Sequence, residues 1–327
     1  KTIQQEKLNN QVAELDVATS ENSIQESIAQ IYIQILYAAE SVRVNENTLQ
    51  VSIAQRDRGQ ELLNAGSIAK SDFAQLEAQV STDRYQLVTA QATLQDYKLQ
   101  LKQLLELDGE NEMNIYLPAL SDENVLSPLP AKRDVYVSAL ALRPEIEASK
   151  LNVNASELGI DIAKSGYLPT VSLSAGIGTN HTSGSDFTFG EQVKNGWNNS
   201  IGLSVSVPIF NNRQTKSAVQ KAKLQYETSM LSLLDEQKAL YKTIEGLWLD
   251  ANSAQQRYAA ANEKLKSTQI SYNLISEQFN LGMKNTVELL TEKNNLLQAQ
   301  QEQLQAKYMA ILNTQLLKFY QGDKLAL

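Results

Sequence analysis

The sequence predicts a mainly α-helical protein with one β-hairpin, in which long helices form antiparallel coiled-coil hairpins in two pseudo-repeats. Three observations carry this prediction: long stretches without glycine or proline, a repeat at a fixed offset, and one segment of alternating apolar and small polar residues. The 327 residues include only 14 Gly and 6 Pro, and aromatic residues make up 6%. This composition favours long helices with thin apolar seams over one thick globular core.

An internal repeat appears when the chain is shifted so that Gly66 falls on Gly282, an offset of 216. The same shift places Ile28–Ile33 on Ile244–Leu249. No gap is needed over roughly 100 residues, which indicates two copies of one helical hairpin. Glycine just past a helix end supplies the left-handed cap that lets the chain turn back, so each of these two glycines is expected to join two helices.

The helices expected around these glycines cover roughly residues 20–64 with 71–107, and 217–280 with 287–320. In the first copy, apolar residues follow the alternating three- and four-residue steps of a heptad seam, with Asp83 as the one exception: Phe73, Leu76, Val80, Leu87, Ala90, Leu94, Tyr97, Leu101 and Leu104. The matching series in the second copy is looser and includes Glu292, Gln303 and Asn313. Heptads specify left-handed coiled-coil packing, and helix packing is the simplest interpretation of both series.

Between the two copies, residues 108–131 are expected to form a linker because they hold Pro118, Pro128, Pro130 and clusters of acidic residues. A short helix from about Lys132 to Leu142 follows. Pro144 then suits the first turn of a further helix that runs to about Ser165.

A β-hairpin is predicted after Gly166. Val171, Leu173, Ala175 and Ile177 alternate with serine and glycine, and so do Ile201, Leu203, Val205 and Val207. A polar loop, about residues 180–195, separates the two runs, and this pattern is typical of a hairpin. Each strand is about 10 residues long, enough to span a bilayer when tilted. Trp197 would suit an interfacial girdle. The alternative is an amphipathic hairpin packed on a soluble core.

Composition excludes several kinds of site. The net charge of −8 argues against a nucleic-acid partner, since phosphate binding needs clustered Lys and Arg. The chain has no cysteine, one histidine and no run of about 18 apolar residues. His181 lies near Ser183, Ser185 and Asp186, but no nucleophile-elbow motif accompanies it, so a Ser-His-Asp hydrolase is not expected. We expect neither an enzyme nor a cofactor or metal.

The sequence resembles the TolC family of outer-membrane efflux proteins over essentially its whole length. Three stretches carry the resemblance: LRPE from Leu142, GYLPTVSLSAGIG from Gly166, and LSVSVPIFNNR from Leu203. The two glycine turns add to it, because an acid follows each glycine six residues later. The ordered set is much more specific than any one piece.

The resemblance implies a homotrimer that forms a periplasmic α-barrel and a shared transmembrane β-barrel. It divides the chain into a first helical hairpin (1–107), a linker with a short helix (108–143), a helix (144–166), the β-hairpin (167–210) and the second helical hairpin (211–327). The implied function is a passive outer-membrane exit channel of a tripartite drug-efflux or type I secretion system. Its implied partners are outer-membrane lipid, a periplasmic adaptor and, through that adaptor, an inner-membrane pump.

One departure from the family is expected at the start of the chain. By the offset of 216, Lys1 corresponds to Ser217, so the first copy lacks the counterpart of about residues 132–216. Two strands per protomer would give a trimer too few strands for the family's barrel. We therefore expect that the natural protein has this upstream helix and hairpin.

The resemblance places a closed periplasmic entrance at the helix tips. Glu288 occupies the place of a first gating aspartate, and Thr291 replaces the second. Lys284 stands where an arginine latches the closed state, and Phe279 stands where a tyrosine does. Three copies of Glu288 around a narrow axis would repel one another and attract cations. Alternatively, Glu288 and Glu292 are first-turn acids favoured by the helix dipole.

The turn residues are where the resemblance places adaptor contact: Ala65, Gly66, Ser67, Ile68, Leu281, Gly282 and Met283. Their small or apolar character suits a contact between tips, although plain helix capping explains them too. The rival to the channel as a whole is a soluble periplasmic coiled-coil scaffold or adaptor-like protein, in which the hairpin is only a small sheet.

Overall fold

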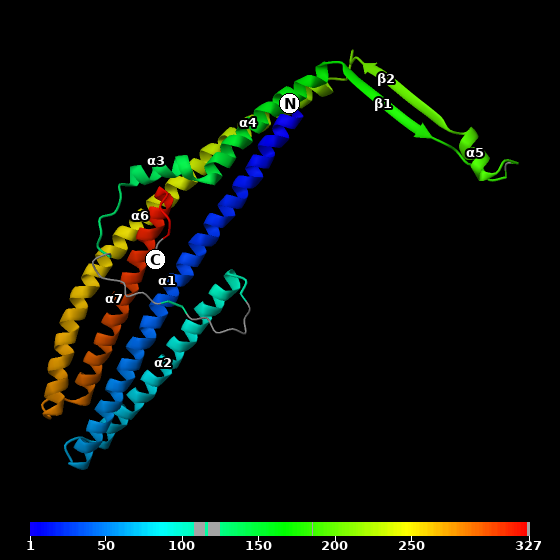
Figure 1. Ribbon diagram of the computed structural model, residues 1–327. Coiled ribbons are helices and arrows are strands. Elements are labelled where there is room, and N and C mark those ends of the chain that lie inside the picture. The colour runs from blue at the N-terminus through cyan, green and yellow to red at the C-terminus, as the bar shows by residue number, and fades with distance from the viewer. Residues whose placement is uncertain (108–114, 117–124, 185, 326–327) are drawn as a thin grey trace. The chain divides into compact units, whose positions relative to one another are not determined.

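The computed structural model describes residues 1–107, 115–116, 125–184 and 186–325, and the rest of the expected linker lies outside the described residues. The chain divides into two compact units: Lys1–Leu15 with Glu145–Glu236, and Asp16–Pro144 with Gln237–Leu327. Two long helices, α1 (Thr2–Asn64) and α6 (Gln214–Asn280), contribute residues to both units (Figure 1). The five-part division inferred from the sequence stays a proposal.

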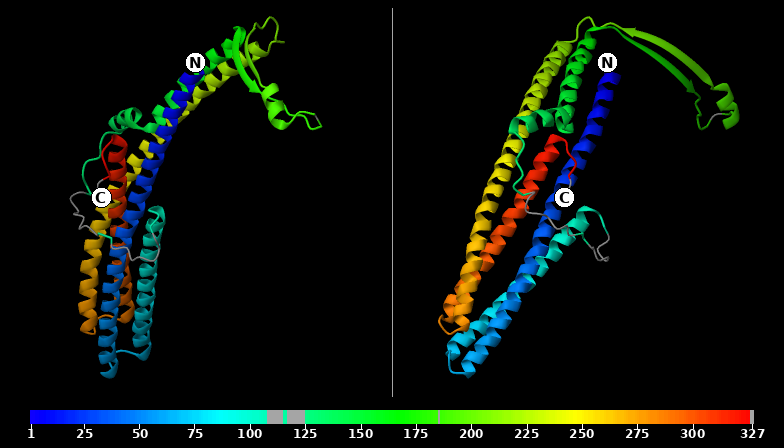
Figure 2. Two further views of the ribbon diagram at one scale, coloured as in Figure 1. Left: turned by 45° about the vertical axis from the view of Figure 1, so that its right-hand side comes forward. Right: turned by 60° about the vertical axis from the view of Figure 1, so that its left-hand side comes forward.

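The second unit is built on two helical hairpins. α1 turns into α2 (Lys70–Leu104), and α6 turns into α7 (Thr286–Gln321). In this unit the two hairpins lie side by side and both turns are at the same end, as Figure 2 shows from two further directions. Asn64 and Lys70 bound the first turn, and their counterparts at the repeat offset, Asn280 and Thr286, bound the second. The expected repeat is therefore confirmed in the helix bounds.

The heptad seams are the buried sides of α2 and α7. In α2, Leu76, Val80 and Leu101 are buried and the remaining apolar members are half-buried. Asp83, the polar exception in that series, is also buried, with 2% of its surface exposed. The looser series in α7 is buried as well, apart from the half-buried Glu292 and Gln303. Coiled-coil packing thus follows the predicted seam even at its polar positions.

The larger core of the second unit lies between α1, α6 and α7. It contains Ile33 and Leu36 of α1, Tyr258 of α6, and Leu312 and Leu316 of α7. All five side chains are less than 9% exposed. Burial of apolar surface between these helices supplies the main stabilisation that long, thin helices can obtain.

Arg143 joins three helices of the second unit. It directly follows α3 (Lys132–Leu142), and its guanidinium is buried. One of its terminal nitrogens lies 2.8 Å from Oε1 of Glu26 on α1, and its Cζ lies 3.8 Å from the ring centre of Tyr320 on α7. α7 ends at Gly322, whose φ of +107° favours glycine.

The first unit contains the start of α1, the start of α6 and, from Glu145 on, α4 (Pro144–Lys164). The short 3₁₀ turn η2 (Ser165–Tyr167) follows α4. Polar contacts tie its helices together. Lys1 Nζ lies 2.8 Å from Asp161 Oδ2, and Gln5 donates to the carbonyl of Ala155 at 2.9 Å. Pro144 takes the first helical position of α4, as its sequence context predicts.

The predicted β-hairpin is present in the first unit. β1 (Thr170–Gly178) and β2 (Asn198–Ser206) pair antiparallel, with Leu173 opposite Leu203 and Ser172 opposite Ser204. Because successive side chains alternate between faces, one face is apolar except for Asn199, and the other carries mainly serine and glycine. Every residue of both strands is exposed.

The connection between the strands differs from the expectation. Residues 180–195 were expected to be loop, but residues Phe189–Asn195 form the helix α5. Its start has a physical cause: the carboxylate of Glu191 accepts from the backbone N–H of Thr188 at 2.9 Å and from its hydroxyl at 2.8 Å. This is the capping pattern of threonine followed three residues later by glutamate, which the sequence contains.

Candidate functional site at the helix tips

The two glycine turns have the same backbone geometry. Gly66 and Gly282 both adopt φ of +72°, in the left-handed region. At the first turn, the N–H of Gly66 donates to Leu63 at 3.0 Å and the N–H of Ser67 donates to Leu62 at 2.8 Å. Such a pair of bonds satisfies carbonyls that the end of a helix leaves free. The capping interpretation of both glycines is therefore confirmed.

The second tip repeats this arrangement and adds a stronger cap. Gly282 donates to Phe279 at 2.9 Å, and Met283 donates to Gln278 at 2.8 Å. Asn285 then caps α7: its side chain accepts from the N–H of Glu288 at 2.9 Å, and the Glu288 carboxylate accepts from the N–H of Asn285 at 3.2 Å. Glu288 is thus an acid of the first helical turn in a reciprocal capping box.

The residues expected to contact an adaptor lie at the solvent-exposed ends of the hairpins. Ala65, Gly66, Ser67, Leu281, Gly282 and Met283 are exposed, and Ile68 is half-buried. Leu281 and Met283 stand out, with 74% and 70% of their surface exposed. The tips also touch, since Arg58 of α1 donates to the carbonyl of Asn280 at 3.3 Å. The structure therefore gathers both sets of turn residues at one end of the second unit.

Glu288 forms an ion pair within its own tip. Lys284 Nζ lies 2.5 Å from Glu288 Oε1. The hydrogen bond from Lys284, followed by that from the Asn285 backbone, lowers the pKa of Glu288 below its ordinary value. Glu288 is consequently ionised at neutral pH, and its ion-pair partner belongs to the same tip.

The other expected gating positions are not all alike. Phe279 is 2% exposed and packs in an apolar cluster with Leu76 and Leu289. Thr291 is exposed, and its hydroxyl donates to the carbonyl of Val287 at 2.7 Å. Glu292 Oε2 accepts from the hydroxyl of Ser271 at 3.0 Å. In this protomer, Phe279 therefore acts as core between the hairpins, whereas Glu288 and Thr291 remain accessible.

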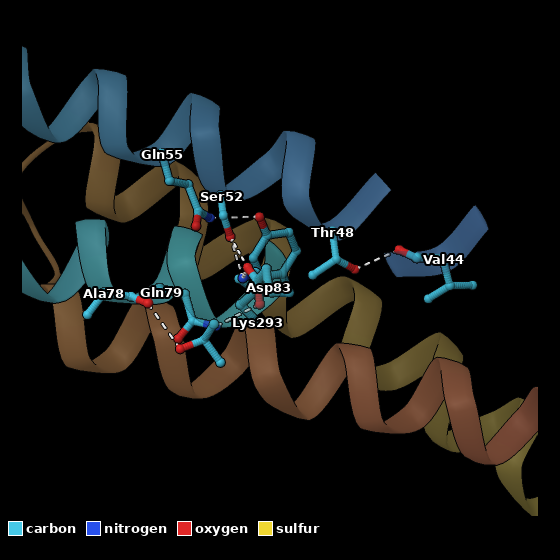
Figure 3. A network of polar contacts seen from close by, with 10 residues as sticks. Val44, Thr48, Ser52, Gln55, Ala78, Gln79, Asp83 and Lys293 are labelled. Atoms are coloured by element: carbon cyan, nitrogen blue, oxygen red, sulfur yellow. Dashed lines mark hydrogen bonds and ion pairs between the residues drawn. The ribbon is translucent and has the colours of Figure 1, made fainter. Parts of the chain in front are cut away.

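A buried polar layer lies further along the hairpins from the tips, and of its members only Asp83 stands out in the sequence. Lys293 of α7 pairs with Asp83 of α2, and both also contact the hydroxyl of Ser52 on α1 (Figure 3). Gln79 donates to the second Asp83 oxygen at 2.9 Å. Beside the layer, Gln55 donates to the hydroxyl of Tyr272 on α6 at 2.9 Å. Asp83 interrupted the heptad pattern, but nothing local to Lys293 indicated its burial.

The ion pair of this layer is almost completely enclosed. The side chains of Lys293 and Asp83 are 3% and 2% exposed. Burial lowers the pKa of Lys293, and the hydrogen bond and charge of Asp83 partly offset that effect. A buried pair of this kind is stable only while both partners remain in place.

Alternatives to the tip site in the described part of the chain are a metal site, a hydrolase arrangement around His181 and membrane-spanning helices. No group of three or more His, Asp or Glu there could hold a metal ion. His181 contacts Gln192 at 3.0 Å and the ring of Phe189 at 5.3 Å between ring centres, and Ser185 lies outside the described residues. Among the described helices, none has the length and apolar character needed to cross a membrane.

Comparison with known sequences gives a family match. The sequence model described as outer membrane efflux protein matches residues 135–322. The chain is 24% identical to the outer membrane efflux protein BepC of Brucella suis over 294 residues, which cover 89% of this chain and 61% of BepC. It is also 24% identical to the outer membrane protein TolC of Escherichia coli, covering 92% of this chain and 62% of TolC. The chain thus spans less than two thirds of the length of these relatives.

Solved structures show the same fold. The CusC structure, from work on its folding and transmembrane channel formation, matches with a TM-score of 0.81 at 18% identity, over 98% of this chain and 73% of CusC. The outer membrane protein VceC of Vibrio cholerae matches with a TM-score of 0.78 at 18% identity, over 98% of this chain and 75% of VceC. The predicted class of long helical hairpins with a β-hairpin is confirmed.

Proposed function

Because this chain belongs to the outer membrane efflux protein family, we propose that it is a protomer of a passive exit channel in the outer membrane of a Gram-negative bacterium. The long helices line a duct through the periplasm, and cargo leaves through it by diffusion. The chain forms part of the wall of this duct and catalyses no reaction. Its machine is a drug-efflux or protein-secretion system, in keeping with relatives named for efflux and for alkaline protease secretion.

The observation that carries this proposal is the two-faced β-hairpin. Leu173 faces Leu203, and Val171 faces Val205, on a face with every side chain exposed. The opposite face carries Ser172 and Ser204. An isolated hairpin is marginal in water, and its two edges cannot be left unpaired in lipid. The pattern fits strands that join others in a membrane barrel, with apolar side chains toward lipid and small polar ones toward water.

The assembly proposed is a homotrimer that meets a periplasmic adaptor at its tips. The exposed Leu281 and Met283 at the end of the second hairpin support such contact, because exposed apolar side chains mark interaction sites when they cluster. The first tip adds Ala65, Gly66, Ser67 and Ile68. An inner-membrane pump would act through the adaptor, and the strands would contact outer-membrane lipid.

Gating is proposed at the same end. Glu288 is ionised and half-exposed, so three copies near a common axis would favour cations. Thr291 and Glu292 lie within about one further turn of α7. Lys284 forms an ion pair with Glu288 inside one protomer, and Phe279 packs in the apolar cluster between the two hairpins.

A pair of substitutions on neighbouring strand positions tests the membrane assignment. Leu203→Lys puts a charge on the apolar face, whereas Ser204→Lys puts the same charge on the opposite face. At the middle of a bilayer a lipid-facing lysine costs roughly 2–4 kcal/mol, so outer-membrane trimers are expected to fall at least about tenfold for Leu203→Lys only. Heat-modifiable trimers in outer-membrane fractions of the natural host provide the measurement.

Two outcomes would count against the proposal. Equal yields of outer-membrane trimer for both variants would mean that the hairpin does not face lipid. Extraction of the unaltered protein as a monomer without detergent would instead support a periplasmic scaffold.

A further inference from the structure

The buried ion pair joins the two repeats. Asp83 belongs to the first hairpin and Lys293 to the second, and Ser52 brings in a third helix. Three helices from both copies therefore meet at one buried polar layer. Val80 and Leu296, about one turn away along α2 and α7, are buried and apolar. On α1, Thr48 and Gln55 are buried on either side of Ser52.

The repeat shows that this layer is specific to one contact. At the offset of 216, Asp83 corresponds to Ala299, and Lys293 corresponds to Glu77. Ala299 of α7 is fully buried and Glu77 of α2 is exposed. A contact in which these two residues took the places of Asp83 and Lys293 would therefore contain no pair of opposite charges. The charges therefore distinguish this contact of α2 with α7 from its repeat-related counterpart.

An apolar heptad seam alone fixes register weakly. Sliding one helix by a heptad moves it about 10 Å and replaces apolar partners with other apolar partners. A buried polar pair changes this balance, because any slide would bury Lys293 and Asp83 separately and unpaired. Single polar positions in a seam are known to specify register in this way.

We infer that Asp83, Lys293 and Ser52 form an axial lock that sets the register of α7 against the α1–α2 hairpin. The lock goes beyond the proposed channel function and fixes the relative height of the two tips. Asp83 and Lys293 lie at different distances along the chain from the turn glycines of their own hairpins. The separation of Asp83 from Gly66 is larger than that of Lys293 from Gly282. The difference is about six residues, so the first tip extends about 9 Å beyond the second at the rise of an α-helix. Figures 1 and 2 show this stagger within the second unit.

Distance measurements on the full chain test the lock. The chain has no cysteine, so Thr82→Cys and Asn294→Cys, both at exposed positions, introduce the only sites for spin labels. Labelled chains diluted in unlabelled ones report the separation of α2 and α7 within one protomer by pulsed electron paramagnetic resonance. The parent protein is expected to give one narrow distribution.

Replacing the pair by apolar residues removes the lock without leaving an unpaired charge. Asp83→Leu with Lys293→Met is expected to keep the helices folded but to broaden the distribution or shift it by up to about 10 Å. The matched control is Lys264→Met with Glu302→Leu, which removes an exposed ion pair 2.7 Å long between α6 and α7. It is expected to leave the distribution narrow. A double apolar variant at Asp83 and Lys293 that keeps the parent distribution would overturn the lock.

Charge reversal provides a second test that does not depend on the apolar variant. Lys293→Asp places two like charges in the layer and is expected to broaden the distribution. Adding Asp83→Lys restores opposite charges and is expected to restore the narrow distribution. If the reversed pair stays as broad as the single variant, register does not depend on this pair and the inference is wrong.

Discussion

Lys284 and Glu288 form a 2.5 Å ion pair within one tip, so the expected gating acid is ionised and has a partner in its own protomer. Because Glu288 also caps α7 through Asn285, its carboxylate is bound in two ways before any neighbouring protomer approaches. Its structural role and its proposed role at the axis are therefore not alternatives. The same carboxylate caps the helix and, in the proposed trimer, would contribute its negative charge beside Lys284 at the entrance.

The first prediction concerns the titration of Glu288. Its pKa is lowered by Lys284 and by Asn285, so the stabilisation from its charged form is present above its ordinary pKa of 4.5 and is lost as pH falls through the lower, folded value. Lys284→Met should move the titration of Glu288 upward, toward 4.5. Carboxyl chemical shifts followed by nuclear magnetic resonance against pH provide the measurement. An unchanged midpoint would show that Lys284 does not hold the carboxylate in solution.

The second prediction compares two glycines inside helices. A Cβ added to Gly59 would lie 2.3 Å from Leu76 Cδ1, whereas a Cβ on Gly246 would meet nothing within 4 Å. Leu76 is 1% exposed and cannot move freely aside. Gly246→Ala should stabilise by up to about 1 kcal/mol through helix propensity. Gly59→Ala should destabilise by about 1 kcal/mol, because overpacking outweighs the same gain. Thermal unfolding measures both variants, and equal shifts of Tm for Gly59→Ala and Gly246→Ala would refute the close approach of α1 and α2 at Gly59.

The third prediction concerns stability in alkali. Burial raises the pKa of Tyr308 to about 12, and the charge of Glu40 adds to the effect. The folded state therefore keeps a proton that the unfolded state releases, and this contribution is present below pH 10 and is lost as pH rises through about 12. The midpoint of urea unfolding should fall over this range, and less steeply in Tyr308→Phe. Identical slopes for the two proteins would count against it.

The fourth prediction concerns Arg143. Arg143→Met leaves Glu26 without its 2.8 Å partner and removes the contact with Tyr320, which should cost about 3 kcal/mol. Arg143→Lys keeps the charge but loses the planar group that stacks on the ring, at a cost of about 1–2 kcal/mol. Arg43→Ala is the control, because Arg43 is 71% exposed in its pair with Glu40. Its effect should stay within about 0.5 kcal/mol. Urea unfolding gives the three values, and equal losses would show that the contacts of Arg143 with Glu26 and Tyr320 do not stabilise the second unit.

Local features were predictable from the sequence because their causes are local. The hairpin turns follow from Gly66 and Gly282, whose left-handed conformation ends a helix wherever it occurs. The strands follow from alternation alone. The helix α5 was also predictable in principle, since Thr188 and Glu191 form its cap, but a short capped helix is easily taken for loop within a polar segment.

Features that depend on contact between distant segments were not predictable in this way. Lys293 meets Asp83 from a distant part of the sequence, and no spacing within α7 indicates that this lysine points inward. Phe279 was assigned from the resemblance to a latch position, yet its surroundings are set by Leu76 of the other hairpin. Such pairings depend on register between helices, which the heptad pattern leaves open.

Single-channel recording on the natural protein, purified from outer membranes into planar lipid bilayers, tests the central claim most directly. The channel assignment predicts discrete conductance steps with a preference for cations at neutral pH. It also predicts that Glu288→Gln changes the conductance or weakens that preference, because the substitution removes one negative charge per protomer from the entrance. Protein that inserts and gives no conductance steps would contradict the claim that this chain forms an exit channel.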